Sequence, residues 1–174
     1  MGENEVVLND RYKILEAVHK GSFGIVYKAE DIQEKAFVAI KEFDLAGMDP
    51  GEVKELQNTL KKEIEYLKNI KHPNLVKFID CFTLEERFFY VTEWIEGISL
   101  KDAIKKMRRP FRGKDVINLF YTLANFIEFL HGQKPPYHLR ILKPSDIIVS
   151  QDGTARIVDL SFLAEFQPEK LSLG

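Results

Sequence analysis

One long helical pattern, set between sheet-like segments, constrains the fold of this chain most. It covers residues 50–70, begins at Asp49-Pro50 and ends before His72-Pro73-Asn74. Aspartate followed by proline is a typical helix start. The apolar positions recur at the three- and four-residue spacing of one helix face: Val53, Leu56, Leu60, Ile64 and Leu67. We therefore expect a single amphipathic helix here.

Alternating apolar and polar residues before and after this helix indicate strands. These segments are 12–18, 25–29, 37–43, 75–82 and 88–94. After Gly97 the pattern becomes helical, at 100–107 and 115–131. The second of these helices has only a narrow polar stripe, so we expect it to be buried on nearly all sides. The sequence thus predicts an α+β fold: a five-stranded sheet with one helix, followed by a helical part.

Composition excludes several classes of function. The chain has 174 residues, 45% hydrophobic, with a net charge of −2, so it carries no charge signature for nucleic acid or for a membrane surface. We find no signal-peptide pattern and no apolar run of membrane-spanning length. The only cysteine, Cys81, lies in an apolar strand pattern and is expected to be a buried, reduced thiol. A cytoplasmic protein is the default expectation.

Two charged residues fall on apolar faces. Lys41 lies in an otherwise apolar strand, and Glu63 lies beside the apolar face of the long helix. A buried cation and a buried carboxylate are stabilised by pairing, so an ion pair is the simplest expectation. The alternative is that both side chains reach solvent at the edge of their elements.

A polar loop precedes a short hairpin near the end of the chain. The hairpin strands are 147–149 and 155–158, with Asp152-Gly153 in the turn. The polar residues of the loop are His138, Arg140, Lys143, Ser145 and Asp146, and Asp159 follows the hairpin. Such a cluster is typical of a functional site. Ile141 in its middle, however, has an aliphatic side chain that cannot take part in acid–base chemistry or bind a metal.

These segments together resemble the protein kinase family, specifically its serine/threonine branch, over residues 12–166. The motifs, in family order, are AVHKGSFGIVYKAE (the glycine-rich loop), VAIK, KHPNLVKFID, YVTEWIEGISL (the hinge), LRILKPSDIIV and VDLS. The resemblance implies a five-stranded antiparallel N-lobe with one helix in 1–96. It implies a partial, helical C-lobe in 97–174, holding helices D and E, the catalytic loop and the DFG equivalent.

The resemblance also implies an ATP site with Mg²⁺. The nucleotide-binding positions would be Val18, Gly21, Gly24, Val26, Ala39, Lys41, Thr92, Glu93, Ile95 and Ile148. Lys41 would hold phosphates with Glu63 as its ion-pair partner, and Asp146 and Asp159 would hold the metal. His19 replaces the first glycine of the glycine-rich loop.

The positions that the family uses for phosphate transfer carry different residues in this chain. Ile141 stands at the place of the catalytic aspartate, and Ile can neither accept a proton nor form a hydrogen bond. Leu139, Asp146 and Ser161 replace the family's His, Asn and Gly. We therefore expect a pseudokinase that binds nucleotide and acts through protein–protein contact or allosteric regulation. Alternatives are a divergent kinase with residual phosphotransfer and a nucleotide-free module.

Two compatible explanations of Ile141 remain open at this point. Either the loop no longer handles a proton, or the side chain fills a hydrophobic gap. The sequence ends fifteen residues after Asp159, so the family's activation segment and large lower-lobe helices are not in it. We expect the apolar surface of helix 115–131 to be covered by another protein or by a missing C-terminal part of the same protein.

Overall fold

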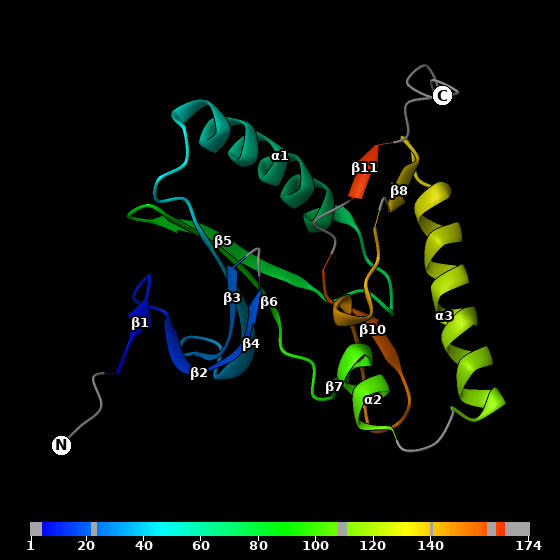
Figure 1. Ribbon diagram of the computed structural model, residues 1–174. Helices are drawn as coiled ribbons and strands as arrows, with labels where there is room; N and C mark the ends of the chain where they lie inside the picture. Colours follow the sequence, from blue (N-terminus) through cyan, green and yellow to red (C-terminus); the bar gives the residue numbers. More distant parts are fainter. Residues whose placement is uncertain (1–4, 22–23, 108–110, 140, 160–162, 166–174) are drawn as a thin grey trace. The chain divides into compact units, whose positions relative to one another are not determined.

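The computed structural model describes residues 5–21, 24–107, 111–139, 141–159 and 163–165. The chain divides into two compact units, Met1–Ile70 with Lys77–Ile95, and Lys71–Val76 with Glu96–Gly174. Each unit has its own secondary structure (Figure 1). Each unit also has its own buried core.

The first unit is built on a six-stranded antiparallel sheet in the order β1-β2-β3-β4-β6-β5. Its strands are β1 (Val7–Leu8), β2 (Tyr12–Gly21), β3 (Gly24–Asp31), β4 (Ala36–Asp44), β5 (Phe78–Leu84) and β6 (Arg87–Glu93). The five expected strands are confirmed, although the fourth of them begins three residues later than expected. The sheet has one strand more than predicted, since β1 pairs Val7 with Lys13.

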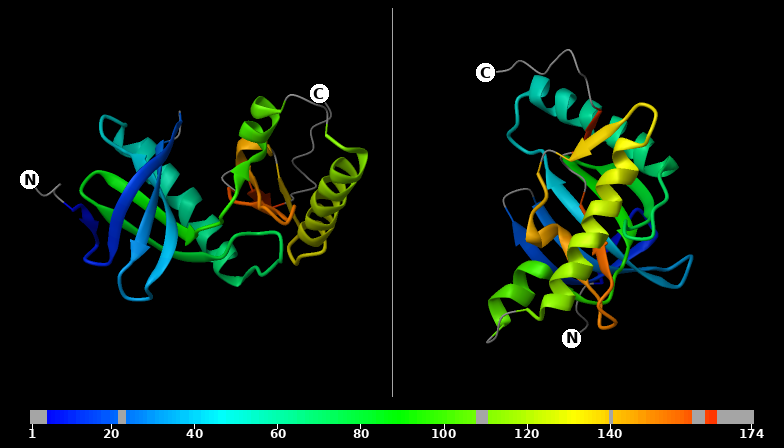
Figure 2. Two further views of the ribbon diagram at one scale, coloured as in Figure 1. Left: turned by 90° about the horizontal axis from the view of Figure 1, so that it is seen from below. Right: turned by 90° about the vertical axis from the view of Figure 1, so that its right-hand side faces the viewer.

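The two faces of this sheet bury different sets of side chains. On one face, Val38 and Ile40 of β4 are buried in a core whose other members are Tyr12, Ala29, Phe89 and Val91. On the other face lies α1 (Pro50–Asn69) (Figure 2). This helix buries Leu60 and Ile64 against Phe88. Asp49 caps α1 by accepting a hydrogen bond from Gly51 N–H at 2.7 Å. The predicted helix and its start are therefore confirmed.

The second unit combines two helices with short strands. Its elements are β7 (Ile98–Ser99), α2 (Leu100–Lys106), α3 (Gly113–His131), β8 (Tyr137–Leu139), η1 (Pro144–Asp146), β9 (Ile147–Val149), β10 (Ala155–Ile157) and β11 (Leu163–Glu165). The strands β10, β9 and β7 form one small sheet, and β11 pairs with β8. The predicted hairpin is confirmed as β9–β10, and Gly153 in its turn has a φ of +84° that favours glycine.

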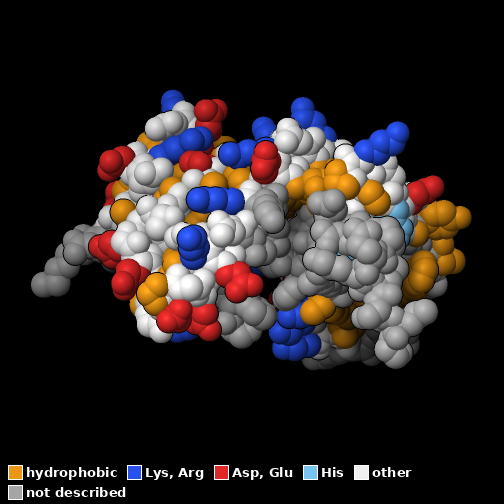
Figure 3. Space-filling model, turned by 90° about the horizontal axis from the view of Figure 1, so that it is seen from above, with side chains coloured by type: hydrophobic (Ala, Val, Ile, Leu, Met, Phe, Trp, Pro, Cys, Tyr) orange, Lys and Arg blue, Asp and Glu red, His pale blue; other side chains and the backbone are white. Residues whose placement is uncertain are grey.

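Helix α3 is much less buried than its narrow polar stripe predicts. Phe126 and Leu130 are fully buried, whereas Phe120 and Tyr121 are 74% and 68% exposed. Further exposed apolar side chains on α3 are Val116, Ile117 and Ile127. Hydrophobic side chains accordingly gather along the α3 edge of the surface in Figure 3. The expectation of burial on nearly all sides is wrong, and the expected exposed apolar surface is observed.

Two smaller expectations can be compared with the structure. Cys81 is partly rather than fully buried, and this burial raises the pKa of its thiol, which keeps it protonated. Among the helices that the structure describes, we find none that is long and apolar enough to span a bilayer.

Candidate functional site

An open area of the sheet in the first unit carries most of the expected nucleotide-binding residues. Val26 pairs directly with Lys41, and Ala39 pairs with Thr92. Paired residues point to the same face of a sheet, and residues 39, 41 and 43 of β4 share a face because side chains alternate. Helix α1 packs at the Phe43 end of this face. Val26 and Ala39 are partly exposed beyond it, while Thr92 is buried.

The wall that the resemblance assigns to the adenine ring continues into β2. Val18 lies in this strand and is 42% exposed. An exposed apolar side chain beside the partly exposed Val26 and Ala39 suits the flat face of a nucleobase. Their role as a nucleotide wall stays a prediction.

The geometry of the glycine-rich turn requires glycine at position 24. Gly21 pairs with Gly24 where β2 and β3 meet. Gly24 has a φ of +125°, and a Cβ there would lie 1.8 Å from the carbonyl oxygen of Glu42. Only glycine therefore allows β3 to approach β4 this closely. Residues 22–23 lie outside the described part of the chain.

Lys41 lies on this face with its ammonium 5.0 Å from the centre of the Phe43 ring. Glu63 lies in α1 directly before the buried Ile64 and three residues after the buried Leu60. Its side chain is outside the described part of the structure. The expected ion pair between Lys41 and Glu63 therefore stays a prediction.

The hinge segment is anchored at its first residues. Glu93 N–H donates to the carbonyl oxygen of Lys77 at 3.0 Å, and Lys77 N–H donates to Glu93 Oε1 at 2.8 Å. This reciprocal pair fixes the end of β6, next to the buried Thr92. Ile95, the second backbone position expected at the adenine edge, follows two residues later and is partly buried.

In the second unit, the backbone brings the two expected metal ligands together. Val158 N–H donates to the carbonyl oxygen of Asp146 at 2.8 Å, which places the neighbouring Asp159 beside η1. The Asp146 carboxylate accepts hydrogen bonds from Lys143 N–H at 2.9 Å and from the Ser145 hydroxyl at 3.0 Å. Each oxygen keeps a second lone pair for a cation. Within the described residues, no cluster of three or more His, Cys, Asp or Glu side chains could hold a metal.

Ile148, expected beneath the adenine, lies in β9 opposite Ser99 and Arg156. Next to it lies Gly97, a residue that sequence reasoning did not assign to the site. A Cβ on Gly97 would come within 2.5 Å of Val149 O and 2.7 Å of Ile148 Cγ2. Gly97 thus sets how closely the chain before β7 approaches Ile148. A lone glycine at the start of a strand is a signal for such an approach.

The catalytic loop places Ile141 at the surface. Its side chain is 46% exposed, whereas the next residue, Leu142, packs against the core formed by Leu100, Ile147 and Ala155. The explanation that Ile141 fills a hydrophobic gap is therefore wrong. The residue is instead nearly half exposed, and its side chain provides no proton acceptor at this position. Arg140 and the DFG-equivalent residues 160–161 lie outside the described part of the chain.

The described residues fit a magnesium nucleotide in part. In the first unit, partly exposed apolar side chains suit a base, and Lys41 would supply a cation for phosphate. In the second unit, Asp146 and Asp159 would supply oxygen ligands of the kind that Mg²⁺ prefers. When bound, Mg²⁺ would neutralise phosphate charge, while the residues of this chain would orient the nucleotide.

Comparison with known proteins defines the family. The protein kinase domain model matches residues 12–172, so the chain belongs to the protein kinase family. It is 30% identical over 171 residues to the probable serine/threonine-protein kinase YbdM of Bacillus subtilis, covering 97% of this chain and 64% of that protein. It is 29% identical over 158 residues to cell division control protein 2 homolog 3 of Trypanosoma brucei brucei, covering 91% and 49%.

A third relative is serine/threonine-protein kinase tousled-like 2 of Xenopus tropicalis. It is 34% identical over 150 residues, which cover 85% of this chain and 21% of that protein. The chain thus spans less than two thirds of the length of each of these relatives. What they share with it is a kinase domain of the serine/threonine type, whose family generally binds ATP and Mg²⁺.

Proposed function

We propose that this kinase domain is a pseudokinase: it binds Mg-ATP, does not transfer phosphate to protein substrates, and acts by contacting or regulating another protein. The exposed Ile141 at the position of the catalytic base carries this proposal. A carboxylate there would accept the proton of the substrate hydroxyl, and general-base help contributes about 10²–10⁴-fold to rate. The same proposal places the domain in the cytoplasm, where ATP and Mg²⁺ are abundant.

Nucleotide binding is tested by the melting temperature with and without Mg-ATP. A ligand that binds only the folded state stabilises it by about 2.7 kcal/mol at a hundredfold excess over Kd. We expect Mg-ATP to raise the melting temperature and Lys41→Met to reduce the increase, because the ammonium holds phosphate. Absence of any increase at millimolar Mg-ATP would leave only a nucleotide-free module.

Phosphotransfer is tested separately, by time-dependent incorporation of labelled phosphate into a generic protein substrate. We expect none above the background of an Asp159→Asn control. Lys41, Asp146 and Asp159 are all present in the chain, and this favours the alternative, a divergent kinase with residual activity. Incorporation that disappears in Asp159→Asn would establish that alternative and overturn the pseudokinase assignment.

The partner that we propose is a protein segment covering the exposed apolar side of α3. It would come from another chain or from a further part of the same protein. Side chains as large and as exposed as Phe120 and Tyr121 are typical of an interface. No nucleic acid or membrane partner is part of this proposal.

A further inference from the structure

The outer side of α3 carries an apolar stripe with the spacing of a coiled-coil seam. Its residues are Ile117, Phe120, Ala124 and Ile127, which follow one another at the alternating three- and four-residue intervals of a heptad. Ile117 is 57% exposed, and the other three are exposed as well. In the right-hand view of Figure 2, α3 lies at the front of the second unit. We call these four residues the outer stripe.

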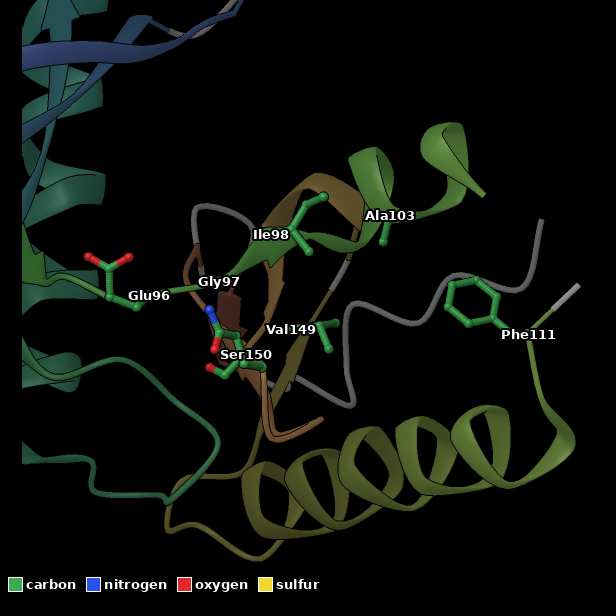
Figure 4. A pocket seen from close by; sticks show the side chains of 8 residues that line it. Glu96, Gly97, Ile98, Ala103, Phe111, Val149 and Ser150 are labelled. Carbon is green, nitrogen blue, oxygen red and sulfur yellow. The ribbon is translucent and has the colours of Figure 1, made fainter. Parts of the chain in front are cut away.

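The inner side of α3 is a separate apolar surface that packs on its own unit. Leu119 and Leu123 contact the small core around Ile147, which Val149 of β9 also joins. Figure 4 shows Val149, one of the residues that line a pocket, above α3, the long helix at the bottom of the view. The outer stripe is therefore a second apolar surface of the helix, distinct from the one that holds α3 in place.

The side-chain sizes in the outer stripe match when two copies of α3 run antiparallel. In this orientation Phe120 of one copy faces Ala124 of the other, and Ile117 faces Ile127. A large side chain opposite a small one lets the two layers interdigitate. In a parallel pair each residue would face its own counterpart, so that two Phe120 rings would crowd one layer and two Ala124 methyl groups would leave a gap in the next.

Two exposed charges beside the outer stripe favour the same orientation. Lys114 lies in the first turn of α3 and Glu128 in its last turn, so each has the sign that the helix dipole disfavours at that end. In an antiparallel pair Lys114 of one copy lies at the same flank as Glu128 of the other, twice by symmetry, and each charge meets its opposite. In a parallel pair the two charges stay about 21 Å apart along the helix axis, too far for an ion pair.

We propose that the partner covering α3 is a second copy of this chain, paired antiparallel through the outer stripe. The inference rests on the interface role proposed above for α3 and names the occupant of that interface. Because both copies use the same surface, the contact closes at two copies and does not extend into a filament. One helix from each copy makes a small interface, so we expect a weak dimer that dissociates in the micromolar range.

The test is sedimentation equilibrium of the 174-residue chain over a range of micromolar concentrations. We expect a monomer–dimer equilibrium, with Lys114→Glu and Glu128→Lys each raising the Kd about tenfold at low salt, because each replaces two attractive pairs by two repulsive ones. The double variant Lys114→Glu/Glu128→Lys re-creates both pairs with the charges exchanged, so its Kd should return to within about threefold of the wild-type value. The matched control, Lys54→Glu at an exposed position of α1, should leave the Kd unchanged.

A second set of variants tests the packing without changing charge. Ala124→Phe places two rings in one layer and should raise the Kd about tenfold, whereas Phe120→Ala/Ala124→Phe restores a large residue opposite a small one and should recover most of the affinity. Asn118→Phe, an exposed position of α3 outside the stripe, is the control and should have no effect. Circular dichroism establishes that each variant is folded.

Three results would overturn the proposal. These are a wild-type chain that stays monomeric, a mass that grows beyond the dimer, and a double charge variant that dimerises as weakly as its single variants. The last result would indicate that a different segment covers α3. The Mg-ATP and phosphotransfer assays are carried out on the same chain and do not depend on dimerisation, so the proposed nucleotide binding and loss of catalysis stand or fall separately.

Discussion

Replacing Gly97 by alanine tests the packing of the second unit at the point where it bears on the proposed nucleotide site. The added Cβ would lie 2.7 Å from Ile148 Cγ2 and 2.5 Å from Val149 O. Carbon atoms in contact are usually about 3.5–4.0 Å apart, so Ile148 or the chain before β7 has to move by roughly 1 Å. Inserting a methyl group into a well-packed region typically costs about 1–3 kcal/mol.

For a chain of this length, each kcal/mol lowers the melting temperature by about 2–4 °C, so we expect Gly97→Ala to melt about 2–12 °C lower than the wild type. The matched control is Gly113→Ala, because a Cβ at this first residue of α3 meets nothing within 4 Å. Alanine there has the better helix propensity, so the control should be neutral or slightly stabilised.

The assay is thermal unfolding followed by circular dichroism, with and without Mg-ATP. If both glycine variants melt at the wild-type temperature, the steric reasoning about Gly97 is wrong. The nucleotide measurement gives a separate result. A displacement of Ile148 away from the adenine should also reduce the increase in melting temperature caused by Mg-ATP. An undiminished increase would show that the substitution leaves nucleotide binding unchanged.

Three further predictions concern stability and association. Asp31 is 1% exposed and accepts hydrogen bonds from the partly exposed Arg11 at 2.9 and 2.6 Å, so Asp31→Ala should lower the free energy of unfolding by about 1.5–3 kcal/mol in denaturant titrations. Asp115→Ala, which removes a surface pair, should cost only about 0–1 kcal/mol. Burial lowers the pKa of His72, so stability should be constant above about pH 6.5 and fall below it, where the unfolded state binds a proton that the folded state resists. Urea titrations at several pH values measure this, and His72→Gln should flatten the dependence. The exposed apolar side of α3 should cause self-association at micromolar concentration that Phe120→Ser reduces, and sedimentation of a stable wild-type monomer that binds no hydrophobic dye would contradict this.

Regular patterns made the main elements of this fold predictable. The helical spacing of Leu60, Ile64 and Leu67 predicted α1, and all three side chains are buried. By contrast, β1 was missed because two residues are too few to show an alternation. Sequence periodicity also cannot tell whether an apolar helix face has a neighbour to cover it, and for that reason the burial of α3 was overestimated.

Features of the candidate site that depend on the type of a side chain can be predicted from the sequence. Features that depend on how closely two distant segments of backbone approach each other cannot. The motifs predicted roles for Lys41, Asp146 and Asp159 directly, since the chemistry of these residues is visible in their side chains, and those roles stay predictions. Gly97 was missed because its importance comes from β9, whose residues are distant in sequence. The same holds for the hydrogen bond from Val158 N–H to Asp146 O, which brings the residue before Asp159 to Asp146 and involves no side chain.

The sequence singles out Ile141, and the structure shows that the loop backbone beside it is anchored by its neighbour. Its neighbour Leu142 is held in the core with Leu100 and Ile147, so the backbone of the loop is anchored independently of residue 141. An exposed side chain at such an anchored position can change without disturbing the packing beneath it. A loop of this kind can therefore lose its proton acceptor and keep its shape. For the same reason, Ile141→Asp should fold like the wild type, and measuring phosphate incorporation in that variant isolates the contribution of the missing base from every other departure in the chain.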